Sequence, residues 1–158
     1  MAYANGYSYR RKITIDHTKV GQSLTTDLAS YPFCFVGTYA YLKVAGSGGK
    51  VQHASGFDIR FELIDGTKLD HEIKNWVDTT GAIVAFVRIP TLAYATNTSI
   101  YIYYGKAGLE ATEENVTGVW DSNYLAVYHL KDITTSTVND STGNKNMTKK
   151  GANEPIEI

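Results

Sequence analysis

The sequence contains one cysteine, Cys34, so a framework of internal disulfides is excluded. No run of about 18 apolar residues occurs, so we expect no membrane-spanning helix and no membrane partner. The N-terminal stretch "MAYANGYSYRRKITI" lacks the apolar h-region of a secretory signal peptide, which indicates a protein made in a cytosol. The 15 basic and 16 acidic residues give a net charge of -1, without the basic excess typical of proteins that bind nucleic acid.

Motifs that carry catalysis are also missing. The sequence has no nucleophile elbow, no phosphate-binding loop, no HExxH and no paired CxxC. Cys34 lies in "PFCFVG" between two phenylalanines, where we expect a small, buried core residue, because a reactive thiolate needs an accessible, electropositive setting. We therefore name no catalytic residue and expect that the protein is not an enzyme.

Strand-like patterns and tyrosine residues dominate the sequence. Twelve tyrosines stand against 5 Phe and 2 Trp, and a tyrosine that buries its ring and keeps its hydroxyl wet suits half-exposed sheets and contact surfaces. In "SYRRKITI", Tyr9, Ile13 and Ile15 alternate with polar residues, as in a strand with one buried face. Seven such strands are expected, at residues 8–15, 31–37, 40–45, 57–64, 69–76, 81–90 and 97–105.

Short strands with closely spaced turn signals predict an all-β fold, an antiparallel β-sandwich that resembles a jelly roll. We assign residues 1–118 to this module. Residues 107–120 are expected to form a connector with one short helical turn, and residues 119–130 one more strand. The remainder, to residue 158, is polar and poor in large apolar side chains, so we expect an extended tail or linker arm that cannot build a core alone.

The stretch "FDIRFELIDGTKLDHEIKNW" predicts a hairpin with a three-residue loop, in which Gly66 takes the left-handed position. This register places apolar residues opposite one another on one face and opposite charges on the other, where each such charge pair contributes about 0.2–1 kcal/mol. The expected pairs are Phe61 with Leu69, Ile59 with His71, Phe57 with Ile73, Arg60 with Asp70, and Glu62 with Lys68.

The same register sets Asp58 against Glu72, with Lys74 diagonal to them. Two facing carboxylates can be neutralised by Lys74 or another basic side chain, can bind calcium or another hard cation, or can serve as the acid pair of a glycosidase. Neutralisation is the preferred interpretation, so we expect no cofactor, and calcium is the one candidate metal. His71 falls on the core side, where a hydrogen-bonded interior histidine is expected.

Three aromatic residues are candidates for a ligand or partner surface. By strand parity, Trp76 shares the charged face of the hairpin, where it can stack on a sugar ring, anchor a protein contact, or be covered by a loop. Tyr101 and Tyr103 share the outer face of the strand "SIYIYYG". The oxygen-rich stretch "DSTGNKN", residues 140–146, could bind a cation, although an Asx-type turn explains it.

The order and spacing of several stretches resemble the bacterial and viral family called domain of unknown function 2341. These stretches are "YRRKITID", the hairpin above, "GAIVAFVRIPTL", "TSIYIYYGKAG" and "VWDSNYLAVYHL" followed by "DSTGN", over roughly residues 7–130. The resemblance implies a β module of large extracellular or surface-associated assemblies, with no established catalytic residues. It also implies that the segment from "VWDSNYLAVYHL" onward is the truncated start of a concanavalin-A-like lectin sandwich.

A module that acts outside cells but lacks a signal peptide fits a tailed bacteriophage, whose proteins are made in the host cytosol and released by lysis. We therefore expect a structural or adhesive virion component, such as a head decoration, head fibre or tail-fibre module. Its partners would be other virion proteins or cell-surface glycans, and a homo-oligomer or a larger assembly is expected. The alternative is a carbohydrate-binding module of a larger extracellular or cell-surface protein. The third hypothesis is a glycoside hydrolase.

Overall fold

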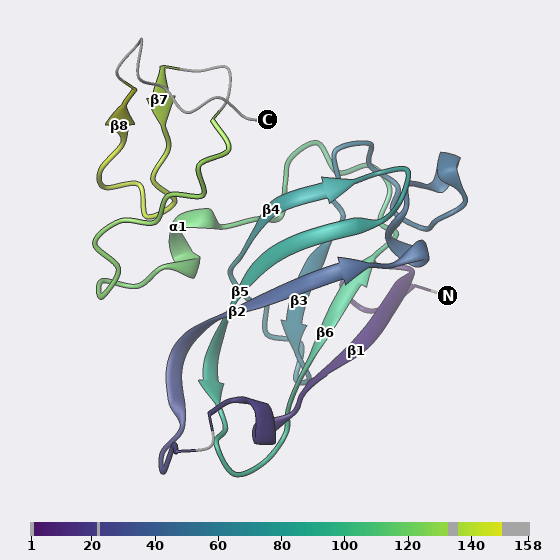
Figure 1. Cartoon of the computed structure of the whole chain (residues 1–158). Helices are drawn as coiled ribbons and strands as arrows, with labels where there is room; N and C mark the ends of the chain where they lie inside the picture. The colour runs from purple at the N-terminus through teal and green to yellow at the C-terminus, as the bar shows by residue number, and fades with distance from the viewer. Residues whose placement is uncertain (1, 22, 133–135, 150–158) are drawn as a thin grey trace.

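The computed structural model describes residues 2–21, 23–132 and 136–149, which form a sandwich of two three-stranded antiparallel sheets (Figure 1). The first sheet has the order β1-β6-β3, with β1 at Tyr9–Ile15, β6 at Thr98–Tyr104 and β3 at Arg60–Leu63. The second has the order β2-β5-β4, with β2 at Leu28–Thr38, β5 at Ala82–Leu92 and β4 at His71–Val77. The all-β antiparallel sandwich that the sequence predicts is confirmed.

The core lies between the two sheets and follows the period-two pattern. Along β5, Ile83, Ala85 and Val87 are buried, whereas the side chains between them are half-exposed. Along β6, Ile100 and Ile102 are buried beneath the first sheet. Because successive side chains of a strand point to opposite faces, this alternation directs one face of each sheet inward.

Two segments that the sequence assigns to strands are not strands. In place of the strand expected at residues 40–45, the chain forms two short 3-10 helices, Ala40–Leu42 and Ala45–Ser47. A further 3-10 helix lies at His17–Lys19. Instead of a strand over 119–130, the chain makes the short helix α1, Val116–Val119, as expected for the connector, and then an irregular segment. Two-residue strands β7, Thr137–Val138, and β8, Met147–Thr148, pair beyond it, on the upper left of Figure 1.

The helices of the described part are all too short and too polar to span a bilayer. Cys34 is exposed, so the prediction that it is buried is wrong. The strand β2 has an inner and an outer side like the others: Phe35 points into the core, and its neighbour Cys34 therefore points out.

The hairpin that links the two sheets has the predicted loop. Leu63 and Thr67 close it with a 2.8 Å hydrogen bond, Gly66 has a φ of 92°, and the N–H of Leu69 donates to the carbonyl of Phe61 at 2.9 Å. Beyond this point the two arms diverge, because β3 pairs with β6 and β4 with β5. The hairpin therefore forms one side of the sandwich and not a longer ribbon.

Candidate functional site

A cluster of tyrosines gathers around one arginine on the outer face of the first sheet. Tyr101 and Tyr103 point outward from β6, as predicted, and the segment before β1 folds over them. Tyr3 packs edge-on against Tyr103 with ring centroids 5.5 Å apart, and Tyr7 does so at 5.8 Å. We call Tyr3, Tyr7, Arg10, Tyr101 and Tyr103 the tyrosine–arginine face.

Arg10 is the centre of this face. Its Nη1 donates a 3.0 Å hydrogen bond to the Tyr103 hydroxyl, which raises the pKa of the guanidinium above its ordinary value. Its Cζ lies 4.6 Å from the ring centroid of Tyr3 and 4.2 Å from that of Tyr101. A guanidinium against ring faces is held by cation–π attraction and keeps its charge, so the face joins flat apolar surface to a fixed positive charge.

The members of the face differ in exposure. Tyr103 is 4% exposed and Tyr7 is fully buried, so they support the surface from below. Tyr3 is 38% exposed, and Tyr101 is half-buried. A ligand would therefore contact Tyr3, Tyr101 and Arg10. Tyr103 would not touch the ligand but would hold these side chains in place.

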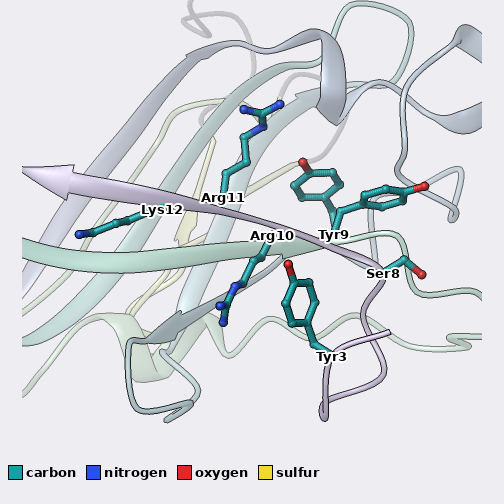
Figure 2. A pocket seen from close by; sticks show the side chains of 7 residues that line it. Tyr3, Ser8, Tyr9, Arg10, Arg11 and Lys12 are labelled. Carbon is teal, nitrogen blue, oxygen red and sulfur yellow. The ribbon is translucent and has the colours of Figure 1, made fainter. Parts of the chain in front are cut away.

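Beside this face lies an open hollow of about 460 Å³ that follows the first half of β1 (Figure 2). Figure 2 shows Arg10 beside Tyr3 on one side of the strand, and Arg11 and Tyr9 on the other. Tyr9 is 40% exposed, and its ring stacks on that of Tyr104 at 5.7 Å. The residues lining the hollow are Tyr3, Ser8, Tyr9, Arg10, Arg11, Lys12 and Tyr104.

The cations of β1 are not neutralised by nearby acids. In the part of the chain that the structure describes, no carboxylate lies within 4.0 Å of the charged groups of Arg10, Arg11 or Lys12. Arg11 instead lies over the ring of Tyr41, with its Cζ 4.4 Å from the centroid. Three neighbouring positive charges give this edge a positive potential in a chain whose net charge is -1.

Acidic residues lie at the β3 side of the same outer face, already paired. Arg60 Nε is 2.8 Å from Glu62 Oε1, and Lys68 Nζ is 3.0 Å from Glu113 Oε2. Arg60 was expected opposite Asp70, but its Nη1 lies 3.3 Å from Glu113. Glu113 follows β6 in the chain and is not part of the hairpin, so hairpin pairing could not reveal it.

The segment before β1 is fastened to this paired cluster. Asn5 Nδ2 donates to Glu62 at 2.9 Å, and Lys106 Nζ donates to the carbonyl of Asn5 at 3.3 Å. The buried hydroxyl of Tyr7 has no hydrogen-bond partner among the described residues, and burial raises the pKa of Tyr7. Tyr3, Tyr7 and Arg10 were not among the residues that the sequence predicts for a site. The run "YANGYSYRR" was their only signal, and it does not show that the segment folds back over β6.

Trp76 is not on the charged face. The pairing of β4 with β5 shifts between Ile73 and Asn75, and a shift of one residue reverses the side to which later side chains point. Trp76 consequently packs against the core cluster, and its Nε1 donates a 2.9 Å hydrogen bond to the carbonyl of Leu42. It remains half-buried and lines an open hollow with Lys74, so a ligand contact there stays a prediction.

Asp58 does not face Glu72, because residues 57 and 58 form a turn before β3. The carboxylate of Asp58 is fully buried and accepts four backbone N–H bonds, between 2.8 and 3.2 Å, from Gln52, His53, Gly105 and Lys106. It joins the loop after the 3-10 helices to the end of β6. The pair that could have formed a cation site or a glycosidase acid pair is therefore not assembled.

Glu72 lies on the outer face of β4 and is engaged by the segment after α1. Its carboxylate accepts hydrogen bonds from Trp120 Nε1 at 3.1 Å and Ser141 Oγ at 2.8 Å, and His129 Nε2 lies 3.2 Å from it. Lys74 is not among these partners. Among the described residues, Glu72 and Asp58 have no hydrogen-bond partner in common. These residues also contain no group of three or more His, Cys, Asp or Glu that could hold a metal ion.

His71 and the stretch 140–146 behave as the residues predict. His71 is fully buried, and its ring nitrogens lie 3.2 Å from the carbonyls of Leu69 and Ile59. Asp140 accepts from the backbone N–H groups of Val127 at 2.7 Å and Lys145 at 2.8 Å, so its oxygens are occupied by turn hydrogen bonds.

Comparison with known proteins gives one result at the level of a family. No curated protein and no solved structure matches the chain. The model of the family described as "Domain of unknown function (DUF2341)" matches residues 55–147, which is more than half of the chain. The match includes β3 to β7 and ends at the first residue of β8, but it contains neither β1 nor β2. The resemblance of the last segment to a lectin sandwich stays a prediction. The chain belongs to the DUF2341 family of domains of unknown function.

Proposed function

We propose that the chain is a non-enzymatic structural and adhesive module, and that it makes its contact through the tyrosine–arginine face. The observation that carries this proposal is the arrangement of Tyr3 and Tyr101 around Arg10, with cation–π distances of 4.6 and 4.2 Å. Exposed tyrosine and arginine are the residues that recur at the energetic centres of protein contacts. A rigid sandwich beneath them lowers the entropy that binding would otherwise cost.

The setting that we propose is a tailed-bacteriophage virion, as a head decoration, head fibre or tail-fibre module, with an extracellular or cell-surface protein as the alternative. Support comes from the sequence resemblance to β modules of surface assemblies. Other virion proteins or a second copy of the chain would then be partners of the face.

Carbohydrate binding is the second candidate, because the face offers half-exposed rings beside a guanidinium. Sugar rings stack on aromatic faces, and their hydroxyls accept from arginine. Asp58 and Glu72 are engaged separately and give no support to a glycoside hydrolase, which needs two carboxylates across one cleft.

One set of variants tests the face against either partner. Tyr3→Ala and Tyr101→Ala each remove a half-exposed ring, and Tyr94→Ala serves as the matched control, since Tyr94 is 41% exposed and lies outside the face. Binding of the purified chain to a glycan array and to detergent-free cell envelopes is measured for each. We expect at least a tenfold loss for the two face variants and none for the control. Equal binding by all variants would contradict the proposal.

The proposed place of the chain in a phage virion is tested by a separate experiment. Phage particles purified from a lysate that contains this gene should carry the chain at a fixed copy number by mass spectrometry. Recovery of the sequence only as part of a longer polypeptide in culture medium would instead support the extracellular alternative.

A further inference from the structure

The strand β1 is an open edge of the first sheet. It pairs with β6 on one side, and no described strand pairs with its other side (Figure 1). Its residues Tyr9 to Lys12 are exposed. An edge of this kind presents unpaired N–H and C=O groups that can accept another strand.

The register of β1 with β6 shows which groups are free. The N–H of Ser8 donates to the carbonyl of Gly105 at 3.3 Å, and Tyr9 lies opposite Tyr104 in the same register. Hydrogen-bonded and non-hydrogen-bonded pairs alternate along an antiparallel ladder. Consequently Arg10 and Lys12 direct their backbone groups to β6. The backbone groups of Tyr9, Arg11 and Ile13 point away from it.

The side chains of this edge carry charge of one sign. Arg10, Arg11 and Lys12 are consecutive, so they place positive charge on both faces of the strand, as Figure 2 shows. Like charges directly opposite one another destabilise a strand pair, so a second copy of β1 is repelled. A strand that carries carboxylates would instead be attracted, because its charges are opposite to those of Arg10, Arg11 and Lys12.

We propose that the free edge of β1 binds an extended acidic segment of a partner protein by adding it to the sheet as a strand. Main-chain hydrogen bonds from Tyr9, Arg11 and Ile13 would supply affinity, and the three cations would select acidic side chains. Addition of this strand uses the open edge and the cations of β1, of which Arg10 also belongs to the tyrosine–arginine face, but it does not require that face to bind an adhesive partner.

The test uses a capped peptide of alternating Thr and Glu, matched in length to β1, with the purified full chain. Residue-resolved amide hydrogen exchange is measured by NMR with and without the peptide. We expect about tenfold or greater slowing at Tyr9, Arg11 and Ile13, and little change at Arg10 and Lys12, whose amides are already bonded to β6. The same peptide N-methylated at every backbone nitrogen keeps its charge but has no N–H left on either edge to bond to β1, and it should not protect these amides.

Two pairs of variants separate the contribution of the main-chain hydrogen bonds to peptide affinity from that of the positive charges. Arg11→Pro removes an outward N–H that an edge strand can lose, whereas Arg11→Ala removes only the side chain, so peptide affinity should fall about tenfold further in Arg11→Pro. Lys12→Glu should weaken binding, and Lys19→Glu, an exposed lysine outside β1, should not.

Four results would overturn the proposal: no binding of the peptide, equal binding of its N-methylated form, equal affinity of Arg11→Pro and Arg11→Ala, or dextran sulfate giving the same exchange pattern. The last would mean that the edge attracts polyanions without forming a strand. The peptide assay contains neither glycans nor cell envelopes. Its outcome is therefore independent of the binding test of the tyrosine–arginine face.

Discussion

Trp120 donates a 3.1 Å hydrogen bond from its indole Nε1 to the buried carboxylate of Glu72. Ser141 donates to the other oxygen of the same carboxylate at 2.8 Å. The ring of Trp120 also contacts that of Phe86, with centroids 5.3 Å apart. One acidic residue on the outer face of β4 therefore attaches two distant parts of the C-terminal segment to the sandwich. The contact between Trp120 and Phe86 adds apolar packing to this attachment.

Removing this carboxylate should release the segment. Glu72→Ala leaves the indole N–H and the Ser141 hydroxyl without an acceptor, and a buried group left unpaired costs about 1–3 kcal/mol. We expect trypsin to cleave faster after Lys131 and Lys145, which are both exposed and lie in the segment. Limited proteolysis followed by mass spectrometry measures the rates.

Glu72→Gln is the matched control for that experiment. It keeps the side-chain length and one acceptor oxygen, so cleavage should be intermediate. Proteolysis of Glu72→Ala at the rate of the unmodified chain would show that apolar contacts such as Trp120 with Phe86 are sufficient to hold the segment.

Asp58 should be among the most sensitive positions for stability. Its fully buried carboxylate accepts four backbone N–H bonds, so Asp58→Ala removes the acceptor of four donors at once. We expect a loss of about 3 kcal/mol or more in the free energy of unfolding, measured by urea denaturation. Asp65→Asn, at an exposed turn with one bond to the N–H of Thr67, should cost below about 1 kcal/mol. A similar loss for both variants would contradict the role of Asp58 as the common acceptor of these four N–H groups.

Period-two burial could be predicted from the sequence because it depends on each strand alone. The alternation of Ile100 and Ile102 with Tyr101 and Tyr103 is visible in the residues and is present in β6. The loop ending at Gly66 was also predictable, since local pairing and a positive φ determine it together.

Features that depend on which strands are neighbours could not be predicted in this way. The pattern of the hairpin does not show that its arms enter different sheets, and so Asp58 was wrongly set against Glu72. One irregular pairing near Lys74 was enough to turn Trp76 toward the core. The partners of Asp58 are backbone N–H groups, which no spacing of side chains reveals.

Stability should fall in mild acid because of His71. Burial lowers the pKa of this imidazole below its ordinary value of 6.5, so below that pH the unfolded chain takes up a proton that the folded chain does not. The free energy of unfolding should then decrease by about 1.4 kcal/mol per pH unit from this group. His71→Gln, measured by urea denaturation across the same range, should lower stability overall and remove that slope. An unchanged slope would assign the effect to another group.

The loop around Asp140 should respond to pH only in stronger acid. Desolvation raises the pKa of Asp140, but hydrogen bonds from the Thr142 hydroxyl and from the backbone N–H groups of Val127, Thr142 and Lys145 lower it more, to well below the ordinary value of 3.8. The contribution of this carboxylate is therefore complete above pH 3.8 and is lost as the pH falls through the lowered pKa.

Hydrogen exchange locates this effect in the loop. In an acid titration, the amides of Val127 and Lys145 should stay protected below the pH at which an ordinary aspartate protonates, and should lose protection together when Asp140 does. Val127 bonds to one oxygen of Asp140 and Lys145 to the other, so Asp140→Ala, which removes both acceptors, should expose both amides at neutral pH and abolish the acid step. Asp121→Ala, where the carboxylate accepts from the N–H of Asn123 at 2.9 Å, should leave both amides unchanged. Independent loss of protection at the two amides would mean that Asp140 is not their common anchor.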